Sequence, residues 1–217
     1  ITGGGEAIHV ALDVSDSRAW QAACEKIMNK FGKLDVLVNN AGVLFAKDIE
    51  DVSLKDWNYM VSVNMTSVFL GTKICAPFLR IAGAQSKAGS AIVNISSVSG
   101  LVAAPLDPLY SMTKGGVTLF TKSTAIAFAN KGDRIRVNAV HPGVTDTKMG
   151  QKVVDVFADK SGMKGDDERI LLSVKRHPIG RIGTTTDVAQ AVLYLSSDAA
   201  AFATGSSLII DGGFTAQ

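Results

Sequence analysis

The sequence predicts one α/β domain of the Rossmann-like, doubly wound type: a parallel sheet with helices on both faces. Short β-rich, apolar runs alternate with amphipathic stretches of helical periodicity. The runs are almost continuously apolar, which is typical of strands buried on both faces. The chain has 217 residues, enough for one such domain with a full core. No repeat or linker pattern divides it, so we assign 1–217 to a single domain.

Five runs are predicted strands, separated by five helical patterns. The strands are Ala7–Leu12, Leu34–Val38, Ala91–Ile95, Ile135–Val140 and Ser207–Ile210. Ser15 or Asp16 is suited to cap a helix that runs to about Phe31, and the other helices are expected near 53–62, 65–84, 109–130 and 186–197. Ligands of such sheets bind beyond the carboxyl ends of the strands. The residues that follow each strand are therefore the first functional candidates.

The beginning of the chain does not fit this scheme. Ile1–Gly4 resembles the end of a first strand that enters a phosphate-binding turn, yet Ala7 already begins another strand. Two parallel strands need a crossover of about a dozen residues or more. We therefore hypothesise that a segment is missing near Gly3 to Gly5, which makes the amino-terminal part of the fold incomplete. The alternative is a genuine glycine turn.

Composition limits the classes of function. Apolar residues make up 47% of the chain and charged residues 19%, and the net charge is +2. Without a dense stripe of Lys and Arg, we expect no nucleic-acid partner and no anionic membrane surface. The longest apolar runs look too short to span a bilayer, and no signal peptide is evident. Cys24 and Cys75 are too few for a disulfide framework and are expected to be buried in a reducing, cytoplasmic protein.

Tyr110 and Lys114 are four residues apart on a predicted helix, so the phenol and the ammonium share a face. A nearby cation favours phenolate and lowers the pKa of a tyrosine. Such a tyrosine can donate and accept protons. The pair taken alone is equally compatible with an ordinary helix surface.

Polar and small residues follow three of the strands. Ser96 and Ser97 supply hydroxyls for a carbonyl oxygen, or else cap a turn. Asn39–Gly42 offers close backbone approach and an Asn side chain that can pin loops, or else a plain turn. Pro142–Thr145 follows a further strand. Their common position at one edge of the sheet favours a site.

In order and spacing, these motifs resemble the short-chain dehydrogenase/reductase family in its single-domain form. The resemblance runs from Ala7 to Gln217 and departs from the family only at the start, where the glycine-rich turn is curtailed. Its motifs are Asp13-Val14, Asn39-Asn40-Ala41-Gly42, Asn64, Ser97, Tyr110, Lys114, Pro142-Gly143 and Asp211-Gly212-Gly213.

The resemblance implies a catalytic set and a cofactor, NAD or NADP. Tyr110 would be the general acid and base, and Ser97 would hold the substrate oxygen. Lys114 would lower the pKa of Tyr110 and bind the nicotinamide ribose. Asn64 would hold a water that links Lys114 to solvent, although a helix-packing role is an alternative. The implied cofactor contacts are Gly3, Asp13, Val14, Asn40, Ala41, Gly42, Tyr110, Lys114, Pro142, Gly143, Val144, Thr145 and Thr147.

The carboxyl end resembles bacterial secondary-alcohol dehydrogenases and ketone reductases. By that resemblance, the chain would form a homotetramer, and the terminal carboxylate of Gln217 would help to hold a structural magnesium ion. An ordinary solvated terminus is the alternative. The acidic run Asp166–Glu168 is interpreted as a solvated loop. The histidines His9, His141 and His177 form no ligand pattern, and His141 is expected to be structural.

Residues 148–181 are the expected substrate-covering lid. Its apolar residues favour a hydrophobic ketone or secondary alcohol, or else only bury helices. They are Met149, Val153, Val154, Phe157, Met163, Ile170, Leu171 and Leu172, with Leu101, Val102 and Leu106 as further wall candidates. The choice between NAD and NADP lies in the segment thought to be missing.

The predicted activity is reversible, NAD(P)-dependent interconversion of a secondary alcohol and a ketone. A 3-oxoacyl-carrier-protein reductase would share every catalytic residue and stays an alternative. An enoyl reductase is disfavoured because that group spaces its Tyr and Lys more widely. A non-catalytic sensor of nicotinamide cofactor is the alternative outside enzymes, but such proteins typically lose the Tyr or the Lys.

Overall fold

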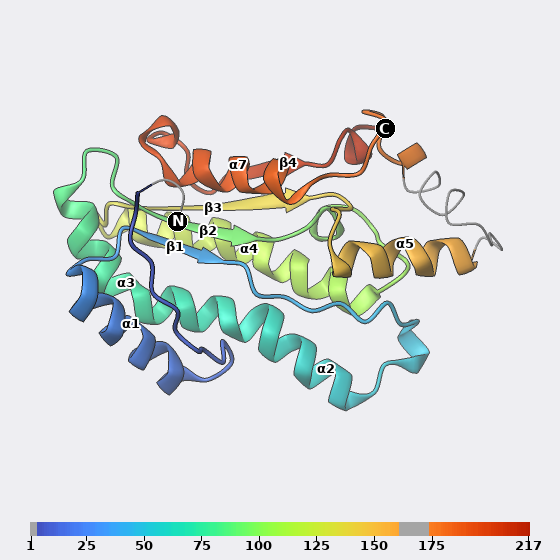
Figure 1. Ribbon diagram of the computed structural model, residues 1–217, viewed down its shortest axis with the longest axis horizontal. Helices are drawn as coiled ribbons and strands as arrows, with labels where there is room; N and C mark the ends of the chain where they lie inside the picture. The colour runs from blue at the N-terminus through green and yellow to red at the C-terminus, as the bar shows by residue number, and fades with distance from the viewer. Residues whose placement is uncertain (1–3, 161–173) are drawn as a thin grey trace.

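The computed structural model describes residues 4–160 and 174–217. Its centre is a parallel sheet of four strands in the order β1-β2-β3-β4 (Figure 1). These are β1 Val36–Asn39, β2 Ser90–Ile95, β3 Ile135–Pro142 and β4 Ser207–Ile210. Because neighbouring strands run in the same direction, their carboxyl ends meet at one edge, where the polar residues of interest follow.

Helices cover both faces of this sheet. On one face, α3 (Ser67–Gln85) lies against β1 and β2, α4 (Pro108–Asn130) lies against β3, and α1 (Ser17–Phe31) packs on α3. On the other face, α7 (Thr185–Ser196) crosses β2, β3 and β4. The remaining helices are α2 (Leu54–Val61) and α5 (Lys148–Lys160). The α/β class with helices on both faces is therefore confirmed.

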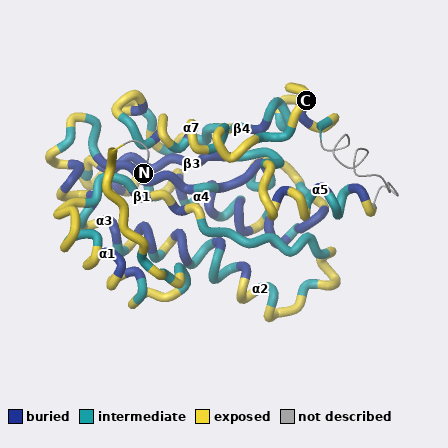
Figure 2. Tube along the Cα trace, in the orientation of Figure 1, coloured by how far each residue is buried: buried dark blue, intermediate teal, exposed yellow. Residues whose placement is uncertain are grey.

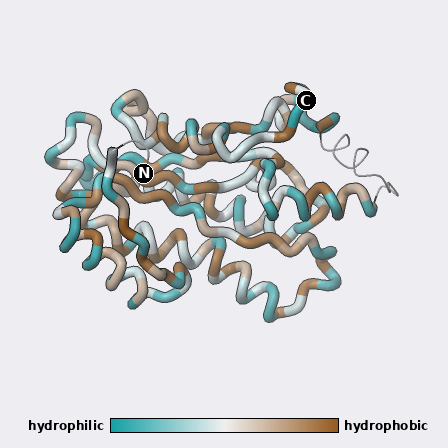
Figure 3. Tube along the Cα trace, in the orientation of Figure 1, coloured by the Kyte–Doolittle hydropathy of each residue, from teal (hydrophilic) through white to brown (hydrophobic). Residues whose placement is uncertain are grey.

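The alternation of side chains along each strand builds two cores. Ile92 packs with Leu37, Val137 and residues of α1, α3 and α4, whereas its neighbour Val93 packs with Val140 and residues of α7. The strands are the most apolar part of the chain, and seven of the eight residues of β3 are buried (Figures 2 and 3). This rigid centre fixes the positions of the strand ends.

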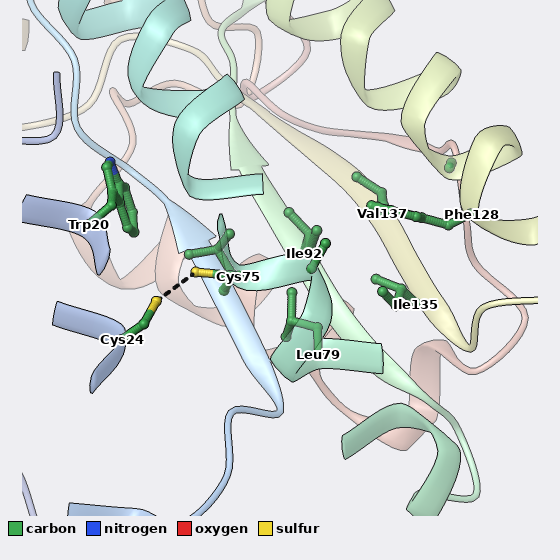
Figure 4. Packing of buried hydrophobic residues seen from close by; sticks show 11 residues of the cluster. Trp20, Cys24, Cys75, Leu79, Ile92, Phe128, Ile135 and Val137 are labelled. Carbon is green, nitrogen blue, oxygen red and sulfur yellow. Dashed lines mark hydrogen bonds between the residues drawn. The ribbon is translucent and has the colours of Figure 1, made fainter. Parts of the chain in front are cut away.

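Cys24 and Cys75 lie in the first of these cores, as expected. Both thiols are free and buried, and their Sγ atoms are 3.7 Å apart between α1 and α3 (Figure 4). Trp20 and Leu79 belong to the same cluster. The two cysteines thus serve as small packing residues between helices.

The helix boundaries agree with the sequence to within one or two residues. Asp16 is the cap of α1, and its side chain accepts a hydrogen bond from the backbone N–H of Arg18. The sequence pattern did not predict the turn that joins α2 to α3. Ser62–Thr66 is a π-helical turn, so the helix continues from Leu54 to Gln85 with one widened turn.

The prediction of a strand at Ala7–Leu12 is wrong for this structure. These residues pair with no strand in the part of the chain that the structure describes, and Ile8 is 40% exposed. A strand in a parallel sheet needs a neighbour for its ladder of hydrogen bonds. Residues 1–3, which were expected to end a first strand, lie outside the described ranges. Leu12 and Val14 still pack against the core of α1 and α3. The missing segment stays a hypothesis.

The continuous helix Leu54–Gln85 is long and apolar enough to cross a membrane, by length and composition alone. The sequence predicts apolar runs too short to span a bilayer, and the continuous helix is longer than these runs because the π-helical turn joins α2 to α3. Half of the qualifying window is buried inside the protein, with a mean hydropathy of 1.2. Core helices of globular proteins meet the same criterion, and α3 packs on β1 and β2 in this way.

Candidate active site

The predicted catalytic pair, Tyr110 and Lys114, lies in the first turns of α4. Asp107 caps this helix by accepting the backbone N–H of Tyr110, and Pro108 occupies its first turn. Tyr110 is 8% exposed and Lys114 is 4% exposed. The Nζ atom of Lys114 lies 5.6 Å from the centre of the Tyr110 ring. The predicted shared face of phenol and ammonium is therefore present.

Burial controls the acidity of both groups. Burial raises the pKa of Tyr110 to about 12; a hydrogen bond with Ser97 opposes this rise, and the charge of Asp107 adds to it. Burial also lowers the pKa of Lys114 to about 8. The expected lowering of the Tyr110 pKa is thus wrong for this structure, since removal from water outweighs the hydrogen bond with Ser97, which lowers the pKa. Tyr110 holds its proton at neutral pH.

The Lys114 ammonium uses only one of its hydrogen-bond donors within the described protein. Its Nζ donates a hydrogen bond to the backbone carbonyl of Ile95 at 2.7 Å, at the end of β2. An ammonium has three N–H donors, so two further donors stay available for hydroxyl acceptors. Gly42 leaves room beside it, because a Cβ there would lie 3.5 Å from this Nζ.

The two serines after β2 have different surroundings. Ser96 points into the protein, where its hydroxyl bonds the carbonyl of Lys114 and the hydroxyl of Thr118. Ser97 instead accepts the N–H of Ser99 and bonds the Tyr110 side chain. Its carbonyl contacts Nδ1 of buried His141 at 3.0 Å. Ser96 is therefore structural, as is His141, and Ser97 is the hydroxyl beside Tyr110.

Asn64 lies in the π-helical turn, and its side chain makes three hydrogen bonds within the protein. Its Oδ1 accepts the N–H of Val43 at 2.8 Å, and its Nδ2 donates to the Val43 carbonyl and the Thr113 hydroxyl. This side chain ties the loop after β1 to α4. The structure thus shows the packing role of Asn64, and the water that it would hold stays a prediction.

The loop after β1 is also held by an asparagine. Asn39 donates to Asn94 at 2.8 Å, and Asn94 donates to Thr121 of α4 at 2.9 Å. Asn40 is exposed, and Ala41 and Gly42 are partly buried. The Asn-Asn-Ala-Gly segment thus has one anchoring residue followed by three residues with accessible backbone.

The loop after β3 is fixed by close packing. A Cβ on Gly143 would meet Nε2 of His177 at 2.9 Å and Cα of Asp211 at 3.0 Å, so only glycine fits. Val144 donates its N–H to the same His177 nitrogen at 3.2 Å. No role for His177 is evident from the sequence, and only the fold brings this late residue beside Gly143 and Val144.

The remaining implied cofactor contacts lie in the loop after β3, just before α1, or outside the described residues. Thr145 is partly buried, and Thr147 is exposed and accepts the N–H of Gly150. Asp13 is exposed and holds the hydroxyl and N–H of Ser15, which lower its pKa. The carbonyl of Val14 accepts the indole N–H of Trp20. Gly3 lies outside the described residues.

Asp107 is a functional candidate that the sequence interpretation missed. It is 2% exposed. Besides capping α4, its carboxylate accepts the N–H groups of Phe45 at 3.0 Å and Ala46 at 2.8 Å. Ala46 has a φ of 57°, which alanine rarely adopts. The carboxylate thus holds a strained loop against the catalytic helix. The Asp-Pro pair just before a helical run was the available signal.

A pocket opens directly beside Tyr110. Of the expected apolar wall residues, Val102, Leu106, Val153 and Phe157 line it, whereas Leu101, Met149 and Val154 do not. Met163, Ile170, Leu171, Leu172 and the run Asp166–Glu168 lie outside the described residues. The full lining is Leu44, Ala46, Val98, Ser99, Val102, Ala103, Ala104, Pro105, Leu106, Asp107, Tyr110, Val144, Val153, Phe157, Arg176 and Phe214.

At the carboxyl terminus, the side chain of Gln217 donates to the carbonyl of Arg176 at 3.2 Å. Within residues 4–160 and 174–217, no cluster of three or more His, Cys, Asp or Glu side chains is arranged to hold a metal ion. The magnesium site implied by the terminal carboxylate stays a prediction.

Comparison with known proteins identifies the family of this chain. The family model described as enoyl-(acyl carrier protein) reductase matches residues 1–215. A cyclopentanol dehydrogenase of Comamonas sp. is 40% identical over 99% of this chain and 79% of its own length. The chain belongs to the short-chain dehydrogenase/reductase family.

Further relatives are dehydrogenases of alcohols. An NADP-dependent (R)-specific alcohol dehydrogenase of Lentilactobacillus kefiri is 36% identical over 99% of this chain and 80% of its own. A trans-4-hydroxycyclohexanecarboxylate dehydrogenase of Sinomonas cyclohexanicum is 37% identical over 97% and 71%. The enoyl reductase description thus belongs to the family model, while these relatives carry dehydrogenase names.

Solved structures agree with the fold. ElxO with NADP bound superposes with a TM-score of 0.80 at 35% identity, covering 95% of this chain and 77% of its own. The ligand-free aldohexose dehydrogenase of Thermoplasma acidophilum superposes with a TM-score of 0.86 at 31% identity, covering 99% and 81%.

Proposed function

We propose that this short-chain dehydrogenase/reductase interconverts secondary alcohols and ketones with NAD or NADP, with Tyr110 as the proton donor and acceptor. The observation that carries the proposal is the buried group of Ser97, Tyr110 and Lys114 beside an apolar pocket at the carboxyl edge of the sheet. The dehydrogenase relatives, one of them NADP-dependent, support this reaction type.

The residues at this edge fit the nicotinamide half of a dinucleotide. Gly42 presents bare backbone beside the Lys114 ammonium, and that ammonium keeps donors for ribose hydroxyls. Bound NAD(P)H supplies the hydride that reaches the carbonyl carbon. Val144 donates a hydrogen bond to His177 and also lines the pocket. We therefore assign the loop of Pro142, Gly143 and Thr145 to contact with the nicotinamide.

The protein's own residues handle the proton and the oxygen. Ser97 donates a hydrogen bond to the substrate oxygen and orients it toward Tyr110. Tyr110 gives its phenolic proton to that oxygen during reduction and takes it back during oxidation. A pKa of about 12 keeps the phenol protonated at neutral pH, which favours the reduction direction there. Lys114 then passes a proton to the Tyr110 phenolate. A water held at Asn64 returns a proton from solvent to Lys114.

Further assignments complete the proposal. We assign Asp13, Val14 and Asn40–Gly42 to the adenosine half, and Gly3 to the phosphate turn. We infer a cytoplasmic homotetramer without nucleic-acid or membrane partners. The magnesium ion at Gln217 is retained as a hypothesis from the carboxyl-terminal resemblance. Residues 148–181 are assigned to cover the substrate.

The rival assignments make separable predictions. A 3-oxoacyl-carrier-protein reductase would prefer acyl thioester substrates, and the cofactor sensor would turn over no substrate. A panel of cyclic and linear ketones, their alcohols and an acetoacetyl thioester, with NADH and NADPH, separates the three by nicotinamide absorbance. The relatives named for cyclopentanol and (R)-specific alcohols favour turnover of the ketones and alcohols over the thioester.

Tyr110→Phe tests the proposal at its centre. Removing the phenolic proton of Tyr110 should lower kcat by about a thousandfold, because general acid catalysis is typically worth about 10²–10⁴. NADPH binding, followed by its fluorescence, should stay within about twofold of the unaltered protein since the ring remains. Unchanged turnover in this variant would defeat the enzyme assignment.

A further inference from the structure

The pocket beside Tyr110 is apolar except for a few polar groups. Alanine, valine, leucine, proline and phenylalanine side chains make most of its described lining. Two charged residues border it, Asp107 and Arg176. Arg176 is therefore the one cation among the described lining residues, and it belongs to the segment before α7, which the catalytic argument does not use.

The charge of Asp107 is already committed inside the protein. Its two oxygens accept three backbone N–H groups, from Phe45, Ala46 and Tyr110, at 2.8 to 3.0 Å. Such a carboxylate is stabilised in place and has no need of Arg176. The pocket is thus left with a positive charge that this acid does not neutralise.

Arg176 is held in position by its surroundings. Its guanidinium carbon lies 4.0 Å from the centre of the Phe157 ring, and both side chains line the pocket. Its backbone carbonyl accepts the Gln217 side chain. Stacking on an aromatic ring orients the guanidinium plane and leaves its N–H edge free to bind.

Two other exposed arginines have carboxylate partners. Arg80 pairs with Asp133 at 2.6 Å, and Arg181 pairs with Asp187 at 2.7 Å, each through two hydrogen bonds. Within residues 4–160 and 174–217, no Asp or Glu forms an ion pair with Arg176. The fork of donors at the pocket is available to a ligand.

We propose that Arg176 selects substrates with a carboxylate on an apolar ring or chain, whose carbonyl or hydroxyl carbon lies at Tyr110. A planar guanidinium binds a carboxylate through two parallel hydrogen bonds, while the apolar walls take the carbon skeleton. The inference rests on the proposed function and narrows its hydrophobic substrate class. The relative named for trans-4-hydroxycyclohexanecarboxylate has a substrate of this chemical type.

A matched pair of substrates tests the charge alone. The initial rates of reduction of 4-oxocyclohexanecarboxylate and of its methyl ester, with cyclohexanone as reference, are followed by nicotinamide absorbance. The unaltered protein should prefer the carboxylate in kcat/KM. Arg176→Leu should lose about 10-fold on the carboxylate, mostly through KM, because the pair is partly screened by water. The ester should change less than about twofold.

Two further variants separate this pair from general effects of charge or folding. Lys175→Leu removes the neighbouring exposed cation, which does not line the pocket, and should leave the preference unchanged. Arg176→Lys should restore part of the preference, since it keeps the charge but not the planar fork. Binding of cyclohexanecarboxylate, measured by thermal shift, should weaken in Arg176→Leu and persist in Lys175→Leu.

The outcomes are distinguishable. If cyclohexanone is reduced but the carboxylate is used no better than its ester, the inference about Arg176 fails and the proposed function stands. Equal losses on both substrates in Arg176→Leu would likewise overturn it, since these indicate a structural role. If none of the three ketones is reduced, the proposed function and the inference both fail.

Discussion

At the scale of single residues, the site depends on buried polar groups, most of which have a specific hydrogen-bond partner, although Oδ1 of Asn39 and Nε2 of His141 have none among the described residues. Ser97 and Ser96 are neighbours with the same chemistry, yet only Ser97 contacts Tyr110, because successive strand-end residues point in different directions. Asp107 is the clearest addition. It sets the first turn of α4, holds the loop of Phe45 and Ala46, and acts electrostatically on Tyr110.

Asp107→Asn tests this electrostatic role through pH. The negative charge of Asp107 raises the pKa of Tyr110, so the uncharged variant should have a lower Tyr110 pKa. The deprotonated phenol is the base for alcohol oxidation, and the rising limb of its rate against pH should move to lower pH. The amide oxygen can still cap α4, but the NH2 group that replaces the other carboxylate oxygen cannot accept the N–H of either Phe45 or Ala46. Activity should also fall at every pH.

The control is Asp56→Asn, which removes a carboxylate from the capping box of α2, away from the pocket. Its pH profile should coincide with that of the unaltered protein. A profile that stays in place in Asp107→Asn would mean that the charge does not reach Tyr110.

At the scale of elements, short loops fixed by distant residues shape the site. The loop after β3 packs against His177 and Asp211, which come more than thirty residues later. The loop after β1 is hydrogen-bonded to Asn64 of the π-helical turn. Each strand end is thus positioned by a second element that only the fold brings near.

Gly143→Ala tests the packing of the loop after β3. The added methyl would contact Nε2 of His177 at 2.9 Å and Cα of Asp211 at 3.0 Å. Overpacking of this kind typically costs about 1–3 kcal/mol of unfolding free energy. Displacement of Val144 should also lower kcat/KM. Denaturant unfolding and initial rates provide the two measurements.

Gly115→Ala is the matched control, because a Cβ at this helical glycine would meet nothing within 4 Å. Replacing it should increase the unfolding free energy, by about 0.5–1 kcal/mol. If Gly143→Ala proved as stable and active as this control, the close fit at the loop would have no functional weight.

At the scale of the whole molecule, two exposed apolar surfaces support the proposed assembly. One lies on α3 and α4 and includes Phe69, Ile81, Leu119 and Ile126, each at least 46% exposed. The other lies around α7 and β4 and includes Leu193, Tyr194, Phe202 and Ile209, each at least 43% exposed. Apolar groups this exposed are typical of interfaces. Two different self-complementary surfaces on one subunit are what a tetramer of two-fold symmetry needs.

Charge introduced on either surface should divide the assembly. Leu119→Asp and Phe202→Asp should each convert tetramers to dimers, and the double variant should be monomeric, as measured by sedimentation velocity. Leu54→Asp is the control, since Leu54 is 73% exposed but lies on α2, outside both surfaces. A single species of monomer mass for the unaltered protein would contradict the tetramer.

The sequence by itself determined the class of fold, the positions of four strands along the chain and the shared helix face of Tyr110 and Lys114. These features are local: hydrophobic runs, caps and a four-residue spacing on one helix. It was wrong for Ala7–Leu12, because a strand exists only with a neighbour, and for the direction of the Tyr110 pKa shift, because burial is not written in spacing. The tertiary structure decided what depends on distant partners. It placed His177 beside Gly143, Asp107 on the loop of Ala46, and Arg176 on Phe157 at the mouth of the pocket, since the sheet alone brings these separate segments to one edge.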